Sequence, residues 1–264
     1  MAILFDLDGV FYQADTPIED AAEVARWASD NNIPHLFLTN TSSKPRSALI
    51  EKLAHFGIET NEAHILTPPV ATVRWLQQNL AGEKIALFVP EKTKSEFSEF
   101  DVAQADDENV AAVIVGDLGS DWDFNTLNRA FRLLMSASKP QLIALGMTRY
   151  WLADEGLRLD VAPFVMALSH ASGVEPLVMG KPAQSFYQAA IDILDKPTEN
   201  IVMVGDDIRG DIEGAQKLGL KAVLVRTGKF RENDLETGIK PDAVLDSVVD
   251  FPSWYEKISF SQAG

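Results

Sequence analysis

Cysteine is absent from the chain, and histidine is scarce. Without cysteine there is no disulfide, no thiol nucleophile and no cysteine metal site. The four histidines, His35, His55, His64 and His170, show no spacing typical of metal ligands. A metal site in this chain would therefore be built from oxygen ligands, which favour hard cations, most simply Mg²⁺.

Basic residues are also few. The chain has 23 Lys and Arg against 39 Asp and Glu, a formal net charge of -16 with a pI near 4.6. Such a surface repels nucleic-acid backbones and anionic lipid, so we expect neither a nucleic-acid nor a membrane partner. No apolar run approaches the length of a membrane span, and no basic leader precedes a long apolar stretch, so the expected location is cytoplasmic.

The chain has short apolar runs that alternate with amphipathic helical patterns. Its 264 residues suit one large domain or two unequal ones, and 46% hydrophobic residues suffice for a sizeable core. Continuous apolar strands separated by helices predict a doubly wound, Rossmann-like α/β fold with a parallel sheet, and a site at the carboxyl ends of its strands. The predicted strands are 2–6, 35–39, 65–67, 85–89, 111–116, 142–145, 201–205, 222–225 and 243–245. The predicted helices are 19–31, 44–55, 69–80, 123–137, 183–194 and 209–218.

Two carboxylates, Asp6 and Asp8, end the first apolar strand, and Gly9 permits a sharp turn after them. In extended backbone, residues two apart share one face. Two neighbouring carboxylates ionise together at low cost only when a cation or a lysine lies between them. The alternative is a surface turn with solvated aspartates.

Small polar residues, beginning with Thr39 and Asn40, follow the second apolar strand. Hydroxyls and backbone N–H groups at a strand-to-helix junction can hold an anion. The alternative is helix capping, which Ser42 or Ser43 would serve.

Lys181 precedes Pro182, which suits the start of the predicted helix 183–194. In that position its ammonium group could meet a phosphate. The alternative is an ordinary surface lysine.

Three aspartates, Asp206, Asp207 and Asp211, follow the apolar strand 201–205. Asp207 could merely cap a helix and Asp211 could merely be exposed. Asp206, at the strand end, has no comparable structural role, and an oxygen-rich cluster points to Mg²⁺.

Taken together and in this order, the four features resemble the motifs of the haloacid dehalogenase (HAD) superfamily of phosphohydrolases. The matching segments are DxDG at Asp6–Gly9, the threonine at Thr39, the lysine at Lys181 and GDDxxxD at Gly205–Asp211. The resemblance covers nearly the whole chain.

The spacing of these motifs resembles subclass IIA, the NagD-like branch. Only about 30 residues separate the first two motifs, whereas about 140 separate the second and third, which leaves room for an inserted domain. We therefore expect a hydrolase core at 1–79 and 179–264, and an inserted α/β cap domain at 80–178 that sets substrate specificity. Within the branch, the chain looks most like the group that contains phospholysine phosphohistidine inorganic pyrophosphate phosphatase.

The resemblance implies a catalytic role for the first motif and a metal site around it. Asp6 would be the nucleophile that forms an aspartyl-phosphate, and Asp8 would be the general acid and base. Mg²⁺ would be held by the Asp6 carboxylate, the Asp8 backbone carbonyl and Asp206. Asp207 and Asp211 would surround the direct ligands of the metal, and Asp211 is the better candidate for a contact through water.

The remaining motifs would bind the substrate. Thr39 and the Asn40 N–H would hold phosphoryl oxygens, and Lys181 would offset the charge of nucleophile and phosphate. In the inserted domain, Arg149 follows an apolar strand, and the segment 147–149 resembles the cap loop that faces the core site in NagD-like enzymes, where Arg149 could contribute to substrate choice. The alternative is a solvated arginine.

The implied function is Mg²⁺-dependent hydrolysis of a small phosphorylated metabolite. A phosphotransferase or mutase would use the same intermediate. A non-enzymatic signalling module of the receiver type also clusters aspartates and a lysine, but a receiver is about half this length and has no inserted domain. The resemblance also suggests a homodimer formed through the cap. The motifs are common to many phosphatases and do not identify the substrate.

Overall fold

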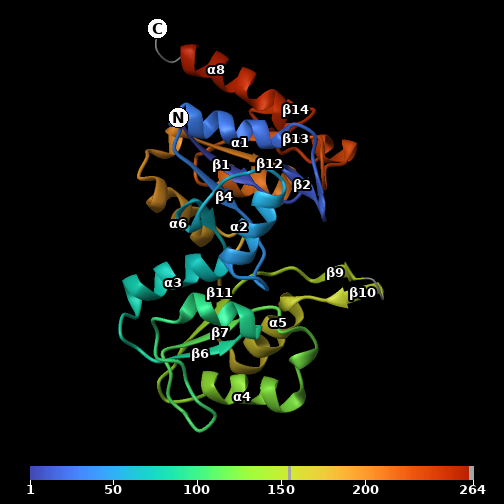
Figure 1. The fold of residues 1–264 in the computed structure, drawn as a ribbon. Helices are drawn as coiled ribbons and strands as arrows, with labels where there is room; N and C mark the ends of the chain where they lie inside the picture. Colours follow the sequence, from blue (N-terminus) through green and yellow to red (C-terminus); the bar gives the residue numbers. More distant parts are fainter. Residues whose placement is uncertain (154–155, 262–264) are drawn as a thin grey trace. The chain divides into compact units, whose positions relative to one another are not determined.

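A computed structural model describes residues 1–153 and 156–261. These residues form two compact units (Figure 1). The first unit combines Met1–Thr39, Arg46–Leu66 and Lys181–Gly264, and the second combines Asn40–Pro45 and Thr67–Gly180. The second unit is therefore inserted into the first.

The first unit contains a six-stranded sheet in the order β14-β13-β12-β1-β4-β5, and every neighbouring pair is parallel. A parallel sheet with this crossover order confirms the doubly wound α/β fold. The strands are β1 (Ala2–Asp6), β4 (His35–Leu38), β5 (Ile65–Leu66), β12 (Ile201–Gly205), β13 (Lys221–Val225) and β14 (Ala243–Leu245).

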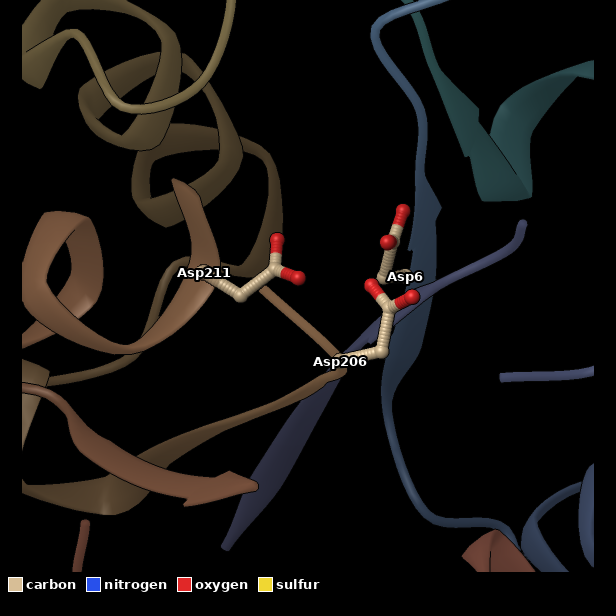
Figure 2. A group of neighbouring side chains, drawn as sticks. All are labelled: Asp6, Asp206 and Asp211. Carbon is tan, nitrogen blue, oxygen red and sulfur yellow. The ribbon is translucent and has the colours of Figure 1, made fainter. Parts of the chain in front are cut away.

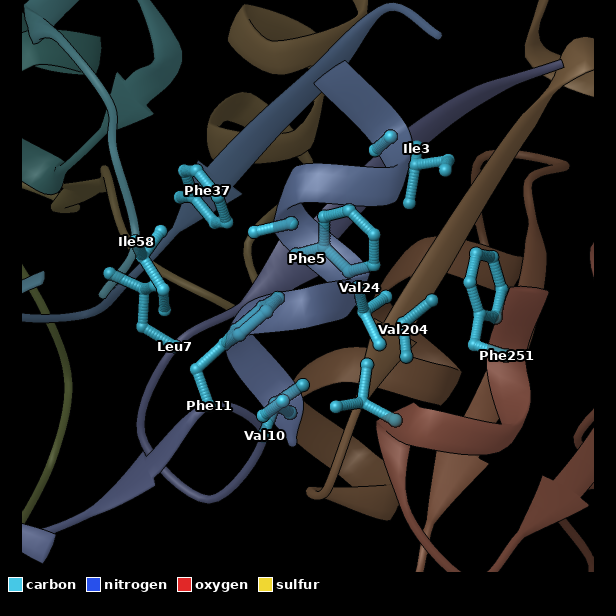
Figure 3. Close-up of a cluster of buried hydrophobic side chains, with 14 of the residues drawn as sticks. Ile3, Phe5, Leu7, Val10, Phe11, Val24, Phe37, Ile58, Val204 and Phe251 are labelled. Atoms are coloured by element: carbon cyan, nitrogen blue, oxygen red, sulfur yellow. The ribbon is translucent and has the colours of Figure 1, made fainter. Parts of the chain in front are cut away.

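Helices cover both faces of this sheet, which explains why its central strands are apolar throughout. On one face, side chains from α1 (Ala21–Asp30), α2 (Arg46–His55) and α8 (Phe251–Ser261) join the strands in one buried cluster (Figure 3). Its aromatic centre is Phe5, whose ring lies 5.4 Å from that of Phe11 and 5.7 Å from that of Phe251. On the other face, α6 (Gln184–Leu194) packs on β4, and the short α7 (Gly214–Gln216) packs on β13.

The second unit has its own parallel sheet, in the order β11-β8-β7-β6, and its own core. Two helices of this unit, α4 and α5, bury their apolar sides on the sheet, whereas α3 packs against the 3₁₀ segment η2 (Glu91–Phe97). A two-stranded antiparallel hairpin, β9–β10, completes it. The elements are α3 (Pro68–Asn79), β6 (Ile85–Phe88), β7 (Ala112–Val115), α4 (Phe124–Leu134), β8 (Gln141–Ala144), β9 (Tyr150–Ala153), β10 (Gly156–Leu159), α5 (Val161–Ser172) and β11 (Leu177–Val178).

The structure differs from the sequence prediction where elements are short or lack a clear period. The sequence did not predict two hairpins, namely β2 (Tyr12–Gln13) with β3 (Thr16–Pro17), and β9 with β10. It also did not predict the strand β11 or the helices α5 and α8. The segment predicted as helix 209–218 forms the π-helical turn η5 (Ile208–Glu213) followed by α7. By its packing, α3 belongs with the inserted unit, so the border lies before this helix and not after it.

Within residues 1–153 and 156–261, every helix is too short or too polar to cross a membrane.

Candidate active site

Two aspartates lie side by side because their strands are neighbours in the sheet. Asp6 is the last residue of β1, and β1 pairs in parallel with β12 so that Phe5 lies opposite Val204. Asp206 follows Gly205, the last residue of β12. Both strands therefore deliver a carboxylate to the same edge, and both aspartates are buried, with 4% and 0% of their surface exposed.

A third aspartate returns to this edge through the turn η5. Asp207 caps the turn, since its Oδ1 accepts hydrogen bonds from the N–H groups of Arg209 (3.0 Å) and Gly210 (2.8 Å). Asp211 is fully buried, and its Oδ2 accepts a hydrogen bond of 3.1 Å from the N–H of Asp207. Tyr187, from α6, holds the turn by donating its hydroxyl to the Gly210 carbonyl at 2.8 Å. Asp207 is thus used as a cap, and Asp211 points into the cluster.

Lys181 joins two of these carboxylates. Its Nζ lies 2.5 Å from Asp6 Oδ1 and 2.7 Å from Asp211 Oδ1, and all three side chains are almost completely buried. Burial acts against the charge of this ammonium group, but the charges of Asp211 and Asp6 outweigh it and raise the pKa of Lys181. The lysine therefore stays charged at the base of the site.

The side chains of Asp6, Asp206 and Asp211 gather at one place (Figure 2), and when all three are ionised they carry more negative charge than one lysine can balance. Each of the three offers one carboxylate oxygen, and these three oxygens lie within 4.8 Å of one another. Burial, and then the charge of Asp6, raise the pKa of both Asp206 and Asp211.

Among the residues that the structure describes, two oxygens of this cluster have no hydrogen-bond partner, Asp206 Oδ1 and Asp211 Oδ1, although the ammonium group of Lys181 lies 2.7 Å from the second. Asp206 Oδ2 accepts the N–H of Lys229 at 2.6 Å, but Asp206 Oδ1 lacks a partner among the residues that the structure describes. A buried carboxylate oxygen without a donor is costly unless a cation meets it. Oxygen-only ligands, burial and excess negative charge together fit a hard divalent cation such as Mg²⁺.

Asp8 lies outside this buried cluster, on the exposed side of the turn that follows β1. Partial burial, and then the charge of Asp6, raise the pKa of Asp8, and they outweigh an interaction with the Ala14 backbone, which favours the ionised form of this carboxylate and lowers its pKa. A carboxyl group with a raised pKa is suited to carry a proton that it later gives up.

The loop after β13 completes the site, and the sequence analysis missed it. Its Lys229 N–H contacts Asp206, and its Thr227 hydroxyl donates to the Gly9 carbonyl. Gly9 and Gly228 have φ values of +92° and +63°, and a Cβ on either one would overlap the Asp206 carboxylate. The signal was the sequence Thr-Gly-Lys, which begins two residues after the end of an apolar strand.

The other predicted residues divide between the two units. Thr39 directly follows β4, the neighbour of β1, so it lies buried at the same edge as Asp6, and its N–H donates to the Leu66 carbonyl at 3.2 Å. Asn40 and Arg149 belong to the second unit. Arg149 is exposed there, with its guanidinium carbon 5.8 Å from the centre of the Tyr150 ring. Their contribution to the site stays a prediction.

Comparison with known proteins gives two family matches and many relatives. The family described as haloacid dehalogenase-like hydrolase matches residues 3–103, and the family described as HAD-hydrolase-like matches residues 178–251. Human phospholysine phosphohistidine inorganic pyrophosphate phosphatase is 33% identical over 253 residues, which cover 94% of this chain and 91% of that protein. Mouse haloacid dehalogenase-like hydrolase domain-containing protein 2 is 33% identical over 244 residues, covering 92% and 90% of the two chains.

Solved structures agree with this assignment. The p-nitrophenyl phosphatase from Archaeoglobus fulgidus superposes with a TM-score of 0.87 at 27% identity, covering 96% of this chain and 98% of that one. NagD from E. coli K-12 superposes with a TM-score of 0.83 over 94% of this chain and 97% of its own, at 22% identity. The match to NagD shows a shared fold. The match to the p-nitrophenyl phosphatase shows a shared fold and also a similarity in sequence.

Proposed function

Because this chain belongs to the haloacid dehalogenase-like hydrolases and is a phosphatase with the NagD-like architecture, we propose that it hydrolyses a small phosphorylated metabolite through a phosphorylated Asp6, with Mg²⁺ bound beside it. The observation that carries the proposal is the buried group at the ends of β1 and β12. There Asp6 is held by Lys181 at 2.5 Å, next to an Asp206 oxygen without a partner.

In the first step, a carboxylate oxygen of Asp6 attacks the phosphorus atom, and the bond from phosphorus to the leaving oxygen breaks. Asp8 gives its proton to that oxygen, so the leaving group departs neutral. The raised pKa of Asp8 supports this role because the group must hold a proton beforehand. In the second step, Asp8 takes a proton from water, the water oxygen attacks phosphorus, and phosphate leaves Asp6 free.

Charge neutralisation is the main task of the other residues. Asp6, the Asp8 backbone carbonyl and Asp206 would hold Mg²⁺, which supplies positive charge for the phosphoryl oxygens and helps to align them. Lys181 offsets the charge of Asp6 itself. In this proposal Asp211 fixes Lys181, and Asp207 caps the turn that carries Asp211.

Thr39 and the Asn40 N–H would bind phosphoryl oxygens, and the inserted unit would choose among substrates through Arg149. The relatives named for phospholysine, phosphohistidine and inorganic pyrophosphate make phosphorus–nitrogen and phosphoanhydride substrates worth testing beside monoesters. The p-nitrophenyl phosphatase neighbour supplies a convenient chromogenic ester.

The experiment is a phosphate-release screen over these substrate classes, with Mg²⁺ and with excess chelator. Asp6→Asn is nearly isosteric and should abolish turnover while the protein stays folded. Asp30→Asn, an exposed aspartate at the end of α1, is the matched control and should keep full activity. Turnover of Asp6→Asn within tenfold of the unaltered enzyme, or full activity in chelator, would rule out the proposal.

A further inference from the structure

The β2–β3 hairpin lies directly after the Asp8 turn and is tied to it. Asp8 and Tyr12 form a β-bridge, and the Gly9 N–H donates to the Tyr12 carbonyl at 2.7 Å. Two residues, Ala14 and Asp15, connect the hairpin strands. The position of this connection bears on Asp8, because the Asp8–Tyr12 bridge ties the hairpin to Asp8 and the Ala14 backbone interacts with the Asp8 carboxylate.

Ala14 adopts an unfavourable backbone conformation. Its φ is +51°, in the left-handed region where a Cβ is disfavoured and glycine is normally found. A residue stays in that region only when its surroundings hold it there.

Lys52, from α2, supplies that hold. Its Nζ donates to the Ala14 carbonyl at 2.6 Å, lies 3.0 Å from Asp15 Oδ1, and sits 4.3 Å from the centre of the Tyr12 ring. One ammonium group thus meets three successive parts of the hairpin. Asp15 is itself almost fully exposed, so the tie to the backbone carbonyl and the ring matters more than the ion pair.

We propose that Lys52 is a positioning residue for proton transfer: it clamps the Ala14 turn of the β2–β3 hairpin, and the turn in turn orients the Asp8 carboxylate toward the leaving group. The inference rests on the proposed function, because it requires Asp8 to be the proton donor. Lys52 itself would touch neither phosphate nor metal.

The test compares kcat/KM for two esters, p-nitrophenyl phosphate and an alkyl phosphate such as glycerol 2-phosphate. This parameter reports on steps up to the first phosphoryl transfer. A p-nitrophenolate needs little protonation to leave, whereas an alkoxide needs a well-placed acid. Lys52→Met keeps the aliphatic stem on Tyr12 and removes the ammonium group. It should lower kcat/KM for the alkyl ester tenfold or more, and for p-nitrophenyl phosphate less than threefold.

Two rescues sharpen the test. Lys52→Arg should keep most of the activity toward the alkyl ester. Adding Ala14→Gly to Lys52→Met should restore at least part of the loss, because glycine adopts φ +51° without help. Arg26→Met removes an exposed cation of α1 that pairs with Glu23, and should change neither ester.

Asp8→Asn separates this inference from the function beneath it. If Asp8→Asn fails to discriminate against the alkyl ester, the proton-donor role is wrong and the proposed function must be revised. If Asp8→Asn discriminates and Lys52→Met leaves both esters unchanged or slows them equally, the clamp alone is refuted. Failure of Ala14→Gly to restore any activity would also refute it.

Discussion

Replacing Asp206 by asparagine should stabilise the metal-free protein even though it destroys the site. Burial, with the charges of Asp6 and Asp211, raises the pKa of Asp206 to about 8 from its ordinary value of 3.8. The folded state therefore retains a proton that the unfolded state releases. Between these two pKa values, the free energy of unfolding falls by about 1.4 kcal/mol per pH unit, because Asp206 is ionised in the unfolded chain and protonated in the folded one.

The sign and size of the effect follow. Stability of the unaltered, metal-free protein should fall as pH rises from about 4 to about 8, and then level off. Over that window the upper limit of the loss due to Asp206 alone is about 6 kcal/mol. Asp211 competes for the same proton, so we expect Asp206→Asn to be more stable by about 2–4 kcal/mol at pH 8. Its amide oxygen can still accept the Lys229 N–H.

Urea unfolding in chelator, from pH 5 to pH 8.5, measures the difference in free energy of unfolding between Asp206→Asn and the unaltered protein. It should widen with pH and vanish toward pH 4. Adding Mg²⁺ should stabilise the unaltered protein and not the variant, because only the former has the full set of ligands. Asp207→Ala is the contrasting control. Although burial acts the other way, hydrogen bonds from the turn hold the pKa of Asp207 low, so its loss should cost about 1 kcal/mol at all pH values above 5. A pH-independent difference, or an Asp206→Asn variant that is less stable at pH 8, would contradict this electrostatic account.

Three further predictions concern the loop after β13, the turn η5 and the inserted unit. Gly228→Ala should abolish the stabilisation by Mg²⁺ in a thermal melt, since its Cβ would overlap the Asp206 carboxylate, whereas Gly238→Ala, with open space around it and the same sign of φ, should keep it. Tyr187→Phe leaves the Gly210 carbonyl without the Tyr187 hydroxyl donor and should lower the free energy of unfolding by about 1–2 kcal/mol. It should also reduce kcat by a larger factor than it raises KM. A change in KM alone would argue against the role of Tyr187 in holding the turn. Arg149→Ala should lower kcat/KM at least tenfold for the best substrate of the screen and much less for p-nitrophenyl phosphate, as expected for loss of about 1.4 kcal/mol of binding; equal losses on both would show that Arg149 does not choose substrates.

The strand-end carboxylates could be predicted because continuous apolar runs that alternate with helical patterns indicate buried parallel strands. Those runs placed Asp6 and Asp206 at the ends of β1 and β12, and the register of the sheet brings the two together. The inserted unit was evident from the unequal spacing of the motifs.

The remaining contacts depend on short or irregular segments with no period to detect. The β2–β3 hairpin has two residues in each strand, and Lys229 reaches Asp206 from a loop after β13. Spacing alone could not separate the roles of Asp207 and Asp211, because a π-helical turn, rather than a regular helix, decides which carboxylate points inward.

The position of β1 between β12 and β4 has a consequence for synthesis of the protein. The ribosome releases β1 and β4 early, but β12 emerges only after the whole inserted unit. Until then one side of the apolar strand Ala2–Asp6 has no partner, and such an edge invites pairing with other chains. The inserted unit has its own sheet and core and could fold during this interval. A nascent chain would therefore depend on the speed of that step, and on chaperones, to protect its first strand until the last part of the sheet arrives.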